Sequence, residues 1–254
     1  MSEAVLKLKN PPIIEAVLDI ECDLPPNFKL GTIETVARKK FAKSYPKLQH
    51  QYIQEHKFEA KLNELPKLSV GGLGVQGLQF LQNDEKQLLQ IRNQGFSFNR
   101  LSPYTSLDDY LPQIKKAWTA YVQMASPIQV RLIRLRYINR FLLPFENNRI
   151  DLEDYLKNGP RPADEQRLVL LGFVNQYSAV DPETANQVLS VLTTQPPESD
   201  KLPIIFDNNT LAQGIFEPKD WEGIRSKILE LRKLKNLLFQ NTLTEKCLKL
   251  FQPY

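Results

Sequence analysis

The sequence predicts an α+β fold in which largely antiparallel sheets are flanked by helices. Several strand-like runs follow one another with few helical crossovers, a pattern that favours α+β over a doubly wound parallel fold. The order strand, helix, several strands and long helix also occurs twice along the chain. We expect a single compact domain, 1–254. The repeated order is consistent with two pseudo-repeated halves, 10–126 and 127–252, although no residue-level repeat accompanies it.

The first half begins with a strand at 12–22, where apolar and polar residues alternate with a period of two. A helix follows at 31–46, with Thr32 as its expected N-cap and Pro46 as its stop. The glycine-rich stretch 69–77 predicts a turn or an irregular connection. Strand-like runs are expected at 48–62, 76–83, 86–93 and 95–101.

An amphipathic helix at 106–125 closes this half, with Ser106 as its cap. Pro112 is compatible with the helix only within its first turn. The second half opens with a long strand at 127–143 and a short helix at 151–159. Further strands are expected at 166–178, 186–194 and 202–215, followed by helices at 218–239 and 242–251, the last capped by Thr242 or Thr244.

The composition is that of an ordinary globular protein. The 254 residues are 42% hydrophobic and 24% charged, with a net charge of +4. This charge is too small to require a nucleic acid or an anionic membrane as partner. Two cysteines far apart in the chain do not form a disulfide framework, and no run approaches the length of a membrane span. We expect a cytoplasmic protein that does not enter a membrane.

Sequence motifs of common enzymes are missing. The chain has no phosphate-binding loop, no dinucleotide-binding glycine motif, no G-x-S-x-G and no H-E-x-x-H. Its two histidines, His50 and His56, would lie about 20 Å apart along one strand, too far to hold the same ion. We therefore expect no metal, cofactor or catalytic residue. An enzyme built on carboxylates and arginines stays open, because 29 acidic residues are too many to locate a pair.

The stretch 131–144, "RLIRLRYINRFLLP", is unusual because arginines interrupt the most strand-like run of the chain. Arg134, Arg136 and Arg140 share one face of the strand. Apolar and polar residues exchange faces near residues 132–134. This exchange predicts a bulge, a strong local twist or a strand that passes from one sheet to another.

Two interpretations compete for these arginines. They can form cross-strand ion pairs with acids of the first strand, namely Glu15, Asp19 and Glu21. Alternatively, the guanidinium groups can bind a phosphate, a carboxylate or an RNA backbone. We favour the ion pairs, because buried charges are usually paired. The candidate ligand- or partner-binding residues of this strand are Arg134, Arg136, Asn139 and Arg140.

The stretch 96–104, "FSFNRLSPY", adds Asn99, Arg100 and Tyr104 as candidate binding residues. An asparagine and an arginine beside exposed aromatic rings can stack on and hydrogen-bond a nucleic-acid base. The same residues can instead close the strand end onto the next helix. We favour the second interpretation, because a Phe-x-Phe pair lies more often in a core than on a stacking surface.

Several landmarks occur together from Asn10 to about Thr244: "NPPIIEAVLDIE", "FSFNRLSPY", the Trp118-x-x-Tyr121 pair, "LRYINRFLLP" and "LRKLKNLLFQNTLT". In these the chain resembles a sporadically distributed family of uncharacterised bacterial proteins. The resemblance implies a single bacterial domain and carries no established activity, cofactor or catalytic residue. The patchy distribution implies an accessory role, such as a partner in a toxin–antitoxin or defence system. The family often shows "LDIDVF" near 202–215; this chain keeps only Asp207, which argues against a two-carboxylate metal site.

The expected function is that of a non-enzymatic bacterial protein that binds a partner, most simply another protein; a homodimer is compatible with the sequence. One alternative is a binder, sensor or enzyme for an anionic nucleotide-like ligand, with Arg100, Arg134, Arg136 and Arg140 holding the phosphates. The other is RNA or DNA binding along the basic residues of the last long helix, where a solvated charged face is the simpler interpretation.

Overall fold

A computed structural model describes residues 8–53, 56–59, 67–70, 74–146, 149–161, 163–164, 167–168 and 170–253. The predicted α+β class is confirmed. Nine strands form one antiparallel sheet in the order β2-β5-β6-β7-β1-β8-β11-β10-β9, and β3 and β4 pair separately. The strands are β1 (Ile13–Asp23), β2 (Lys47–Ile53), β3 (His56–Glu59), β4 (Lys67–Val70), β5 (Gly74–Leu81), β6 (Gln87–Arg92), β7 (Gly95–Leu101), β8 (Gln129–Pro144), β9 (Val174–Val180), β10 (Gln187–Thr194) and β11 (Lys201–Phe216).

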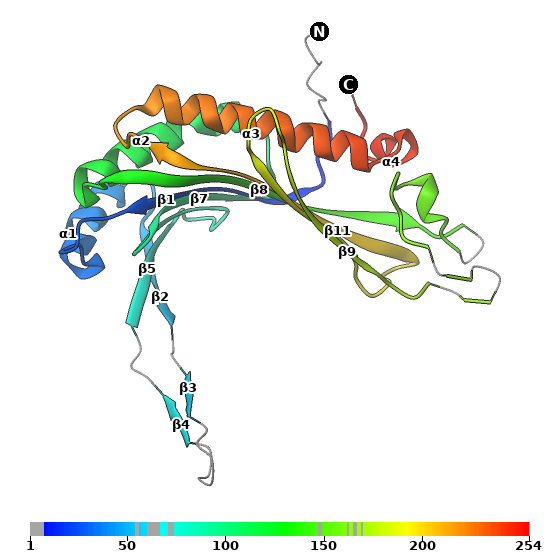
Figure 1. Ribbon diagram of the computed structural model, residues 1–254, viewed down its shortest axis with the longest axis horizontal. Helices are drawn as coiled ribbons and strands as arrows, with labels where there is room; N and C mark the ends of the chain where they lie inside the picture. Colours follow the sequence, from blue (N-terminus) through cyan, green and yellow to red (C-terminus); the bar gives the residue numbers. More distant parts are fainter. Residues whose placement is uncertain are drawn as a thin grey trace.

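The helices of the described chain cover one face of this sheet (Figure 1). They are α1 (Leu30–Phe41), α2 (Leu107–Ala125), α3 (Trp221–Thr242) and the short α4 (Glu245–Lys249). A large core lies between the sheet and α1, α2 and the first half of α3. A second cluster surrounds the C-terminal part of α3 and α4. The β3–β4 pair extends away from the sheet (Figure 1).

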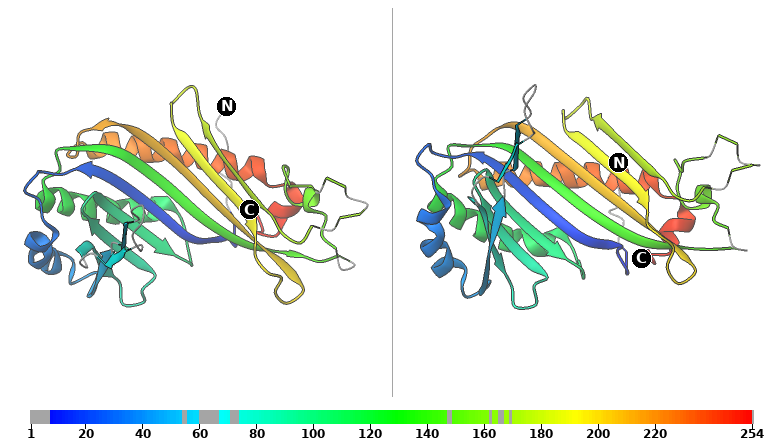
Figure 2. Two further views of the ribbon diagram at one scale, coloured as in Figure 1. Left: turned by 60° about the horizontal axis from the view of Figure 1, so that its bottom comes forward. Right: turned by 90° about the horizontal axis from the view of Figure 1, so that it is seen from below.

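The two halves of the chain repeat one order of elements within this sheet. Each half starts with a central strand, β1 or β8, and these two strands pair antiparallel. The chain then moves to an outer edge, at β2 or β9, and returns strand by strand to the central one. Each half next forms a long helix, α2 or α3, along the same face of the sheet (Figure 2). Ser126, in the left-handed conformation, ends α2 just before the second half.

Of the three explanations offered for the exchange of faces in the arginine-rich strand, the structure shows the bulge. The pairing of β1 with β8 steps from Glu21 opposite Leu132 to Cys22 opposite Val130, so that Arg131 is the additional residue. Because of this extra residue, Val130 and Ile133 can both face the helices, and both are fully buried. Beyond the bulge, β8 alternates regularly between buried residues and partly exposed ones.

Two capping predictions are confirmed and one is wrong. The backbone N–H of Asp108 donates to Ser106, and that of Cys247 donates to Thr244, which caps α4. Helix α1 instead begins after Lys29, which provides no side-chain cap. Thr32 already lies in the first turn, where its hydroxyl donates to the Lys29 carbonyl (2.7 Å).

Four other local predictions need correction. The strand expected at 166–178 begins only at Val174 and continues to Val180, as β9. Pro112 lies in the second turn of α2, on its exposed side, where water can bond the carbonyl that the missing N–H leaves free. The predicted helix at 151–159 is only a 3-10 turn, Leu152–Asp154, because the following residues pair with the end of α3. The glycine-rich stretch 69–77 falls largely within β4 and β5; its remaining residues, 71–73, lie outside the described chain.

Candidate partner-binding face

The face of the sheet opposite the helices, called the open face here, carries most of the predicted arginines. Strand alternation puts every second residue of each strand on it. The helices of the described chain all lie on the other side (Figures 1 and 2). On the central strands, the open face consists of Glu15, Val17, Asp19 and Glu21 of β1, Arg134, Arg136, Ile138 and Arg140 of β8, and Ile205, Asp207, Asn209 and Leu211 of β11.

Asp19 is the most buried charged group of this face, with 5% of its surface exposed. Arg92 of β6 donates to one of its oxygens, and Arg134 lies 3.4 Å from the other. Burial raises the pKa of Asp19 more than the two guanidinium groups lower it. Arg134 also approaches Glu21 (3.8 Å). Thus Arg134 contacts two of the three acids that the sequence suggested for it.

Arg136 turns away from the first strand and pairs with Asp207 of β11. Its Nε lies 2.9 and 3.1 Å from the two carboxylate oxygens, and a terminal nitrogen lies 2.5 Å from one of them. The hydrogen bonds that Arg136 donates to Asp207 hold the pKa of Arg136 above its usual value. The physical reason for this partner is the register: the residue opposite Arg136 on β1 is Val17, which has no charge.

The remaining members of the predicted ion pairs also find partners that the sequence did not indicate. Arg140 bonds Gln195 (3.1 Å) and Glu198 (2.7 Å), which follow β10. Glu15 accepts a hydrogen bond from Asn99 of β7 (2.8 Å). The side-chain oxygen of Asn99 also accepts a hydrogen bond from Gln90 of β6. Asn99 is therefore a buried residue that connects β1 with β6, and it is not an exposed binding group.

Three other predicted site residues lie on the helix side of the sheet. Asn139 is buried and donates to the backbone carbonyl of Phe206 (3.0 Å). Tyr104 shares a hydroxyl–hydroxyl hydrogen bond with Tyr137 (2.7 Å). Arg100 donates to the carbonyl of Pro103. The seven candidate binding residues are therefore divided between two sides of the sheet and do not form one site.

The aromatic residues of "FSFNRLSPY" are core residues. Phe96 packs against Trp118 and Tyr121 of α2, and Phe98 packs against Tyr110. Both phenylalanines are buried. Their rings are consequently covered by α2 and are not available for stacking on a nucleic-acid base.

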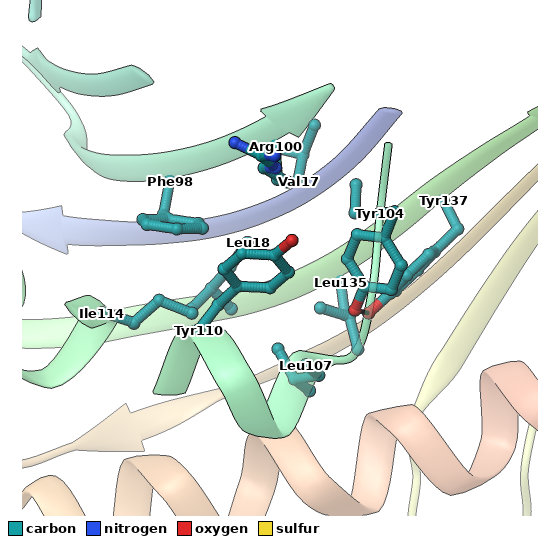
Figure 3. Close-up of a pocket in the computed structure, with 11 residues that line it drawn as sticks. Val17, Leu18, Phe98, Arg100, Tyr104, Leu107, Tyr110, Ile114, Leu135 and Tyr137 are labelled. Atoms are coloured by element: carbon teal, nitrogen blue, oxygen red, sulfur yellow. Dashed lines mark hydrogen bonds between the residues drawn. The ribbon is translucent and has the colours of Figure 1, made fainter. Parts of the chain in front are cut away.

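A small cavity lies among the tyrosines on the helix side (Figure 3). Tyr104, Tyr110 and Tyr137 line it, and Arg100 lies at its margin (Figure 3). Its volume is about 10 Å3, room for about one water molecule. A nucleotide does not fit in this space. A wider depression of about 380 Å3 lies beside the bulge, where Asp23, Asn93 and Arg131 line it together with residues of the turn after β1.

Lys235 of α3 is one of the basic residues of the last long helix, for which the sequence suggested a solvated charged face, but its amine lies against an aromatic ring of the sheet. Its amine lies 4.0 Å from the ring centroid of Tyr137. Burial, and secondarily the charge of Arg232, lower its pKa to about 7. The helical spacing could have indicated this burial, because Lys235 follows Ile228 by seven residues and Leu231 by four, and both of these residues lie on the buried side of the helix.

Comparison with known proteins adds no relative: neither a family model nor a curated protein sequence matches the chain. Within the described residues, His, Cys, Asp and Glu side chains form no group of three or more that could hold a metal ion. None of the helices in that same part of the chain is both long and apolar enough to span a bilayer.

Proposed function

We propose that this protein is a non-enzymatic bacterial binding protein that recognises another protein through its open face. The observation that supports this proposal is that the arginines of this face are already ion-paired within the protein. Arg134, Arg136 and Arg140 already have carboxylate partners, while apolar residues such as Val17 and Ile138 stay partly exposed between them. A face that mixes paired arginines with apolar side chains resembles the composition of protein–protein interfaces, where arginine is enriched.

The charge balance of the face favours a protein over a polyanion. A protein binds a nucleic acid tightly when its unpaired lysine and arginine side chains displace the counterions that surround the phosphates. On the open face, a phosphate would have to compete with Asp19, Asp207 and Glu198 for the same guanidinium groups. Such competition costs part of the electrostatic gain, because each carboxylate displaced must itself find new partners.

Site-specific photo-crosslinking in living cells tests this proposal. A photoreactive phenylalanine analogue in place of Ile138 reports on contacts of the open face. The same analogue in place of Leu237, which is 39% exposed on α3, is the matched control. We expect a discrete crosslinked protein from position 138 and none from position 237. Crosslinks to nucleic acid from position 138, or to a protein from position 237 alone, contradict the proposal.

A pair of valine variants gives a quantitative check. Val17→Asp changes a partly exposed residue of the open face, and Val36→Asp introduces the same charge on the exposed side of α1. We expect Val17→Asp to weaken capture of the crosslinked partner at least about tenfold, equivalent to about 1.4 kcal/mol. Val36→Asp should leave capture unchanged. Equal effects of the two variants, at matched melting temperatures, would remove the open face as the binding surface.

The resemblance to a sporadically distributed bacterial family supports a cytoplasmic accessory role, such as a partner in a toxin–antitoxin or defence system. Genomic neighbourhood tests this part of the proposal. A gene for a toxin or nuclease beside this one in several genomes would support an antitoxin-like role. Neighbours that vary without any such gene would contradict it.

A second candidate is binding of an anionic nucleotide-like ligand. One observation favours it: among the described residues, the Nε atoms of Arg92 and Arg134 are buried without a hydrogen-bond partner. A thermal-shift screen with nucleotides tests the idea, since a ligand that binds the folded state raises the melting temperature. No shift across the panel would count against this candidate.

A further inference from the structure

The segment 170–180, "LLGFVNQYSAV", contains no charged residue, although most of it is exposed. Leu171 is 92% exposed, Val174 72% and Val180 61%. Leu170 and Tyr177 are also exposed. A run of apolar side chains that stays in water is costly for a monomer and marks surfaces that become covered by a partner.

This segment contains β9, an edge strand of the nine-stranded sheet. Edge strands usually carry charges, prolines or bulges that prevent pairing with another chain. The opposite edge, β2, follows this rule: it has Lys47 and a register irregularity between Gln51 and Tyr52. In contrast, β9 has no charge and no proline, and its pairing with β10 is regular from end to end.

The free backbone groups of β9 can be identified from the bonds at its two ends. The carbonyl of Phe173 accepts from Thr194 (3.2 Å), and the N–H of Asp181 donates to Asn186 (2.8 Å). Odd-numbered residues therefore direct their N–H and C=O groups towards β10. Because these groups alternate along an antiparallel strand, Val174, Gln176, Ser178 and Val180 direct theirs to the free edge.

We propose that β9 pairs with β9 of a second copy of this chain, antiparallel and around a two-fold axis at Tyr177. This register places Val174 opposite Val180 of the partner subunit and Gln176 opposite Ser178 of the partner subunit. All four residues have outward N–H and C=O groups, so both pairs exchange hydrogen bonds. Tyr177 meets the partner subunit's Tyr177 at the centre, in a non-hydrogen-bonded position where side chains lie close.

The strand itself argues for a second copy rather than another protein. A two-fold interface must be self-complementary, since the same patch is used on both subunits. On either side of Tyr177, the strand "VNQYSAV" has first an uncharged polar residue (Gln176 or Ser178), then Asn175 or Ala179, and then a valine (Val174 or Val180). The two-fold register therefore brings Val onto Val and creates no like-charge pair.

The expected dimer is weak. A seven-residue strand and the flanking Leu170 and Leu171 offer less area than the roughly 1,200 Å2 that marks the lower end of stable specific interfaces. We expect dissociation in the micromolar range, so that the dimer is favoured at high local concentration. This surface is an edge of the sheet and is separate from the open face, so the inference goes beyond the proposed function.

Sedimentation analysis of the full chain between about 1 and 200 μM tests the pairing, because a dimer of this size should change population across this range. Val174→Lys adds a charge at the edge, and Val36→Lys is the matched control on α1. Ser178→Pro removes one outward N–H and keeps the inward bonds to β10. We expect Val174→Lys and Ser178→Pro to raise the dissociation constant at least tenfold, and Val36→Lys to leave it unchanged.

A cysteine variant tests the register. Opposed residues in a non-hydrogen-bonded pair have Cα atoms about 4.5 Å apart, within disulfide reach. Under mild oxidation, Tyr177→Cys should therefore form a covalent dimer, whereas Val36→Cys should not; the two native cysteines are buried. A wild-type chain that stays monomeric at 200 μM, a dimer unaffected by Val174→Lys and Ser178→Pro, or equal crosslinking of the two cysteine variants would overturn the proposal.

Discussion

Lys235 should make the stability of this protein depend on pH in the neutral and mildly alkaline range. Folding lowers the pKa of this amine from its usual 10.5 to about 7, mainly through burial. Between these values the unfolded chain binds the proton more tightly than the folded chain, so stability rises with pH across this window. Below about pH 7 the amine is charged in both states, and the full cost of burying the charge remains.

The magnitude follows from the shift and from the surroundings of the amine. A shift of this size corresponds to about 5 kcal/mol at 1.36 kcal/mol per pKa unit. About 3 kcal/mol of this total falls between pH 6.5 and 9.5, because most of the interval between the two pKa values lies in that range. The side chain is partly exposed, and the Tyr137 ring, 4.0 Å from the amine, favours its charged form, so this figure is an upper bound.

Urea unfolding of the wild type and of Lys235→Met, at pH values from 6.5 to 9.5, measures this effect. The buried Trp118 and Trp221 report unfolding by fluorescence. At pH 6.5 the variant should be more stable than the wild type, and the difference should shrink by about 2–3 kcal/mol by pH 9.5. Stability curves that run parallel across this range would refute the reasoning, because they would mean that Lys235 titrates alike in both states.

Two further comparisons test the sheet. Gly95→Ala should cost at least about 3 kcal/mol or prevent folding, because the new Cβ would clash with the Ile20 carbonyl oxygen at 2.1 Å, whereas Gly31→Ala, with open space in α1, should stabilise by roughly 0.5–1 kcal/mol in the same urea assay. Arg136→Ala should cost about 1–2 kcal/mol because it removes the hydrogen bonds to both carboxylate oxygens of Asp207, and Arg140→Ala, in a more exposed pair, less than about 1 kcal/mol. Loss of partner binding by Arg136→Ala at an unchanged melting temperature would instead assign that guanidinium to binding.

Local features of the fold could be predicted because they depend on neighbouring residues. The alternation in β1 follows from the two-residue period of a strand. The exchange of polarity in β8 indicated an irregularity near residues 132–134, and the structure shows it as the bulge at Arg131, because an extra residue reverses the faces. The caps at Ser106 and Thr244 follow from side chains that can accept a backbone N–H.

The arrangement of the site could be predicted only in part. The sequence indicated that the arginines of β8 need acidic partners, and Arg134 does contact Asp19 and Glu21. It did not indicate that β8 has β11 as its second neighbour, and this neighbour supplies Asp207 to Arg136. Strand neighbours are chosen by contacts distant in sequence, so the pattern within one strand does not determine which acid faces which arginine.

The sequence by itself determined most of the strands, the long helices, the repeated order of the elements and the need of the arginines for partners, because these depend on periodicity and on the cost of burying charge. Only the tertiary structure decided that the candidate residues divide between two sides of one sheet. It likewise placed Lys235 against Tyr137 and left the uncharged β9 at an edge. The physical reason is that exposure and pairing are properties of neighbours in space, and the order of the nine strands sets those neighbours.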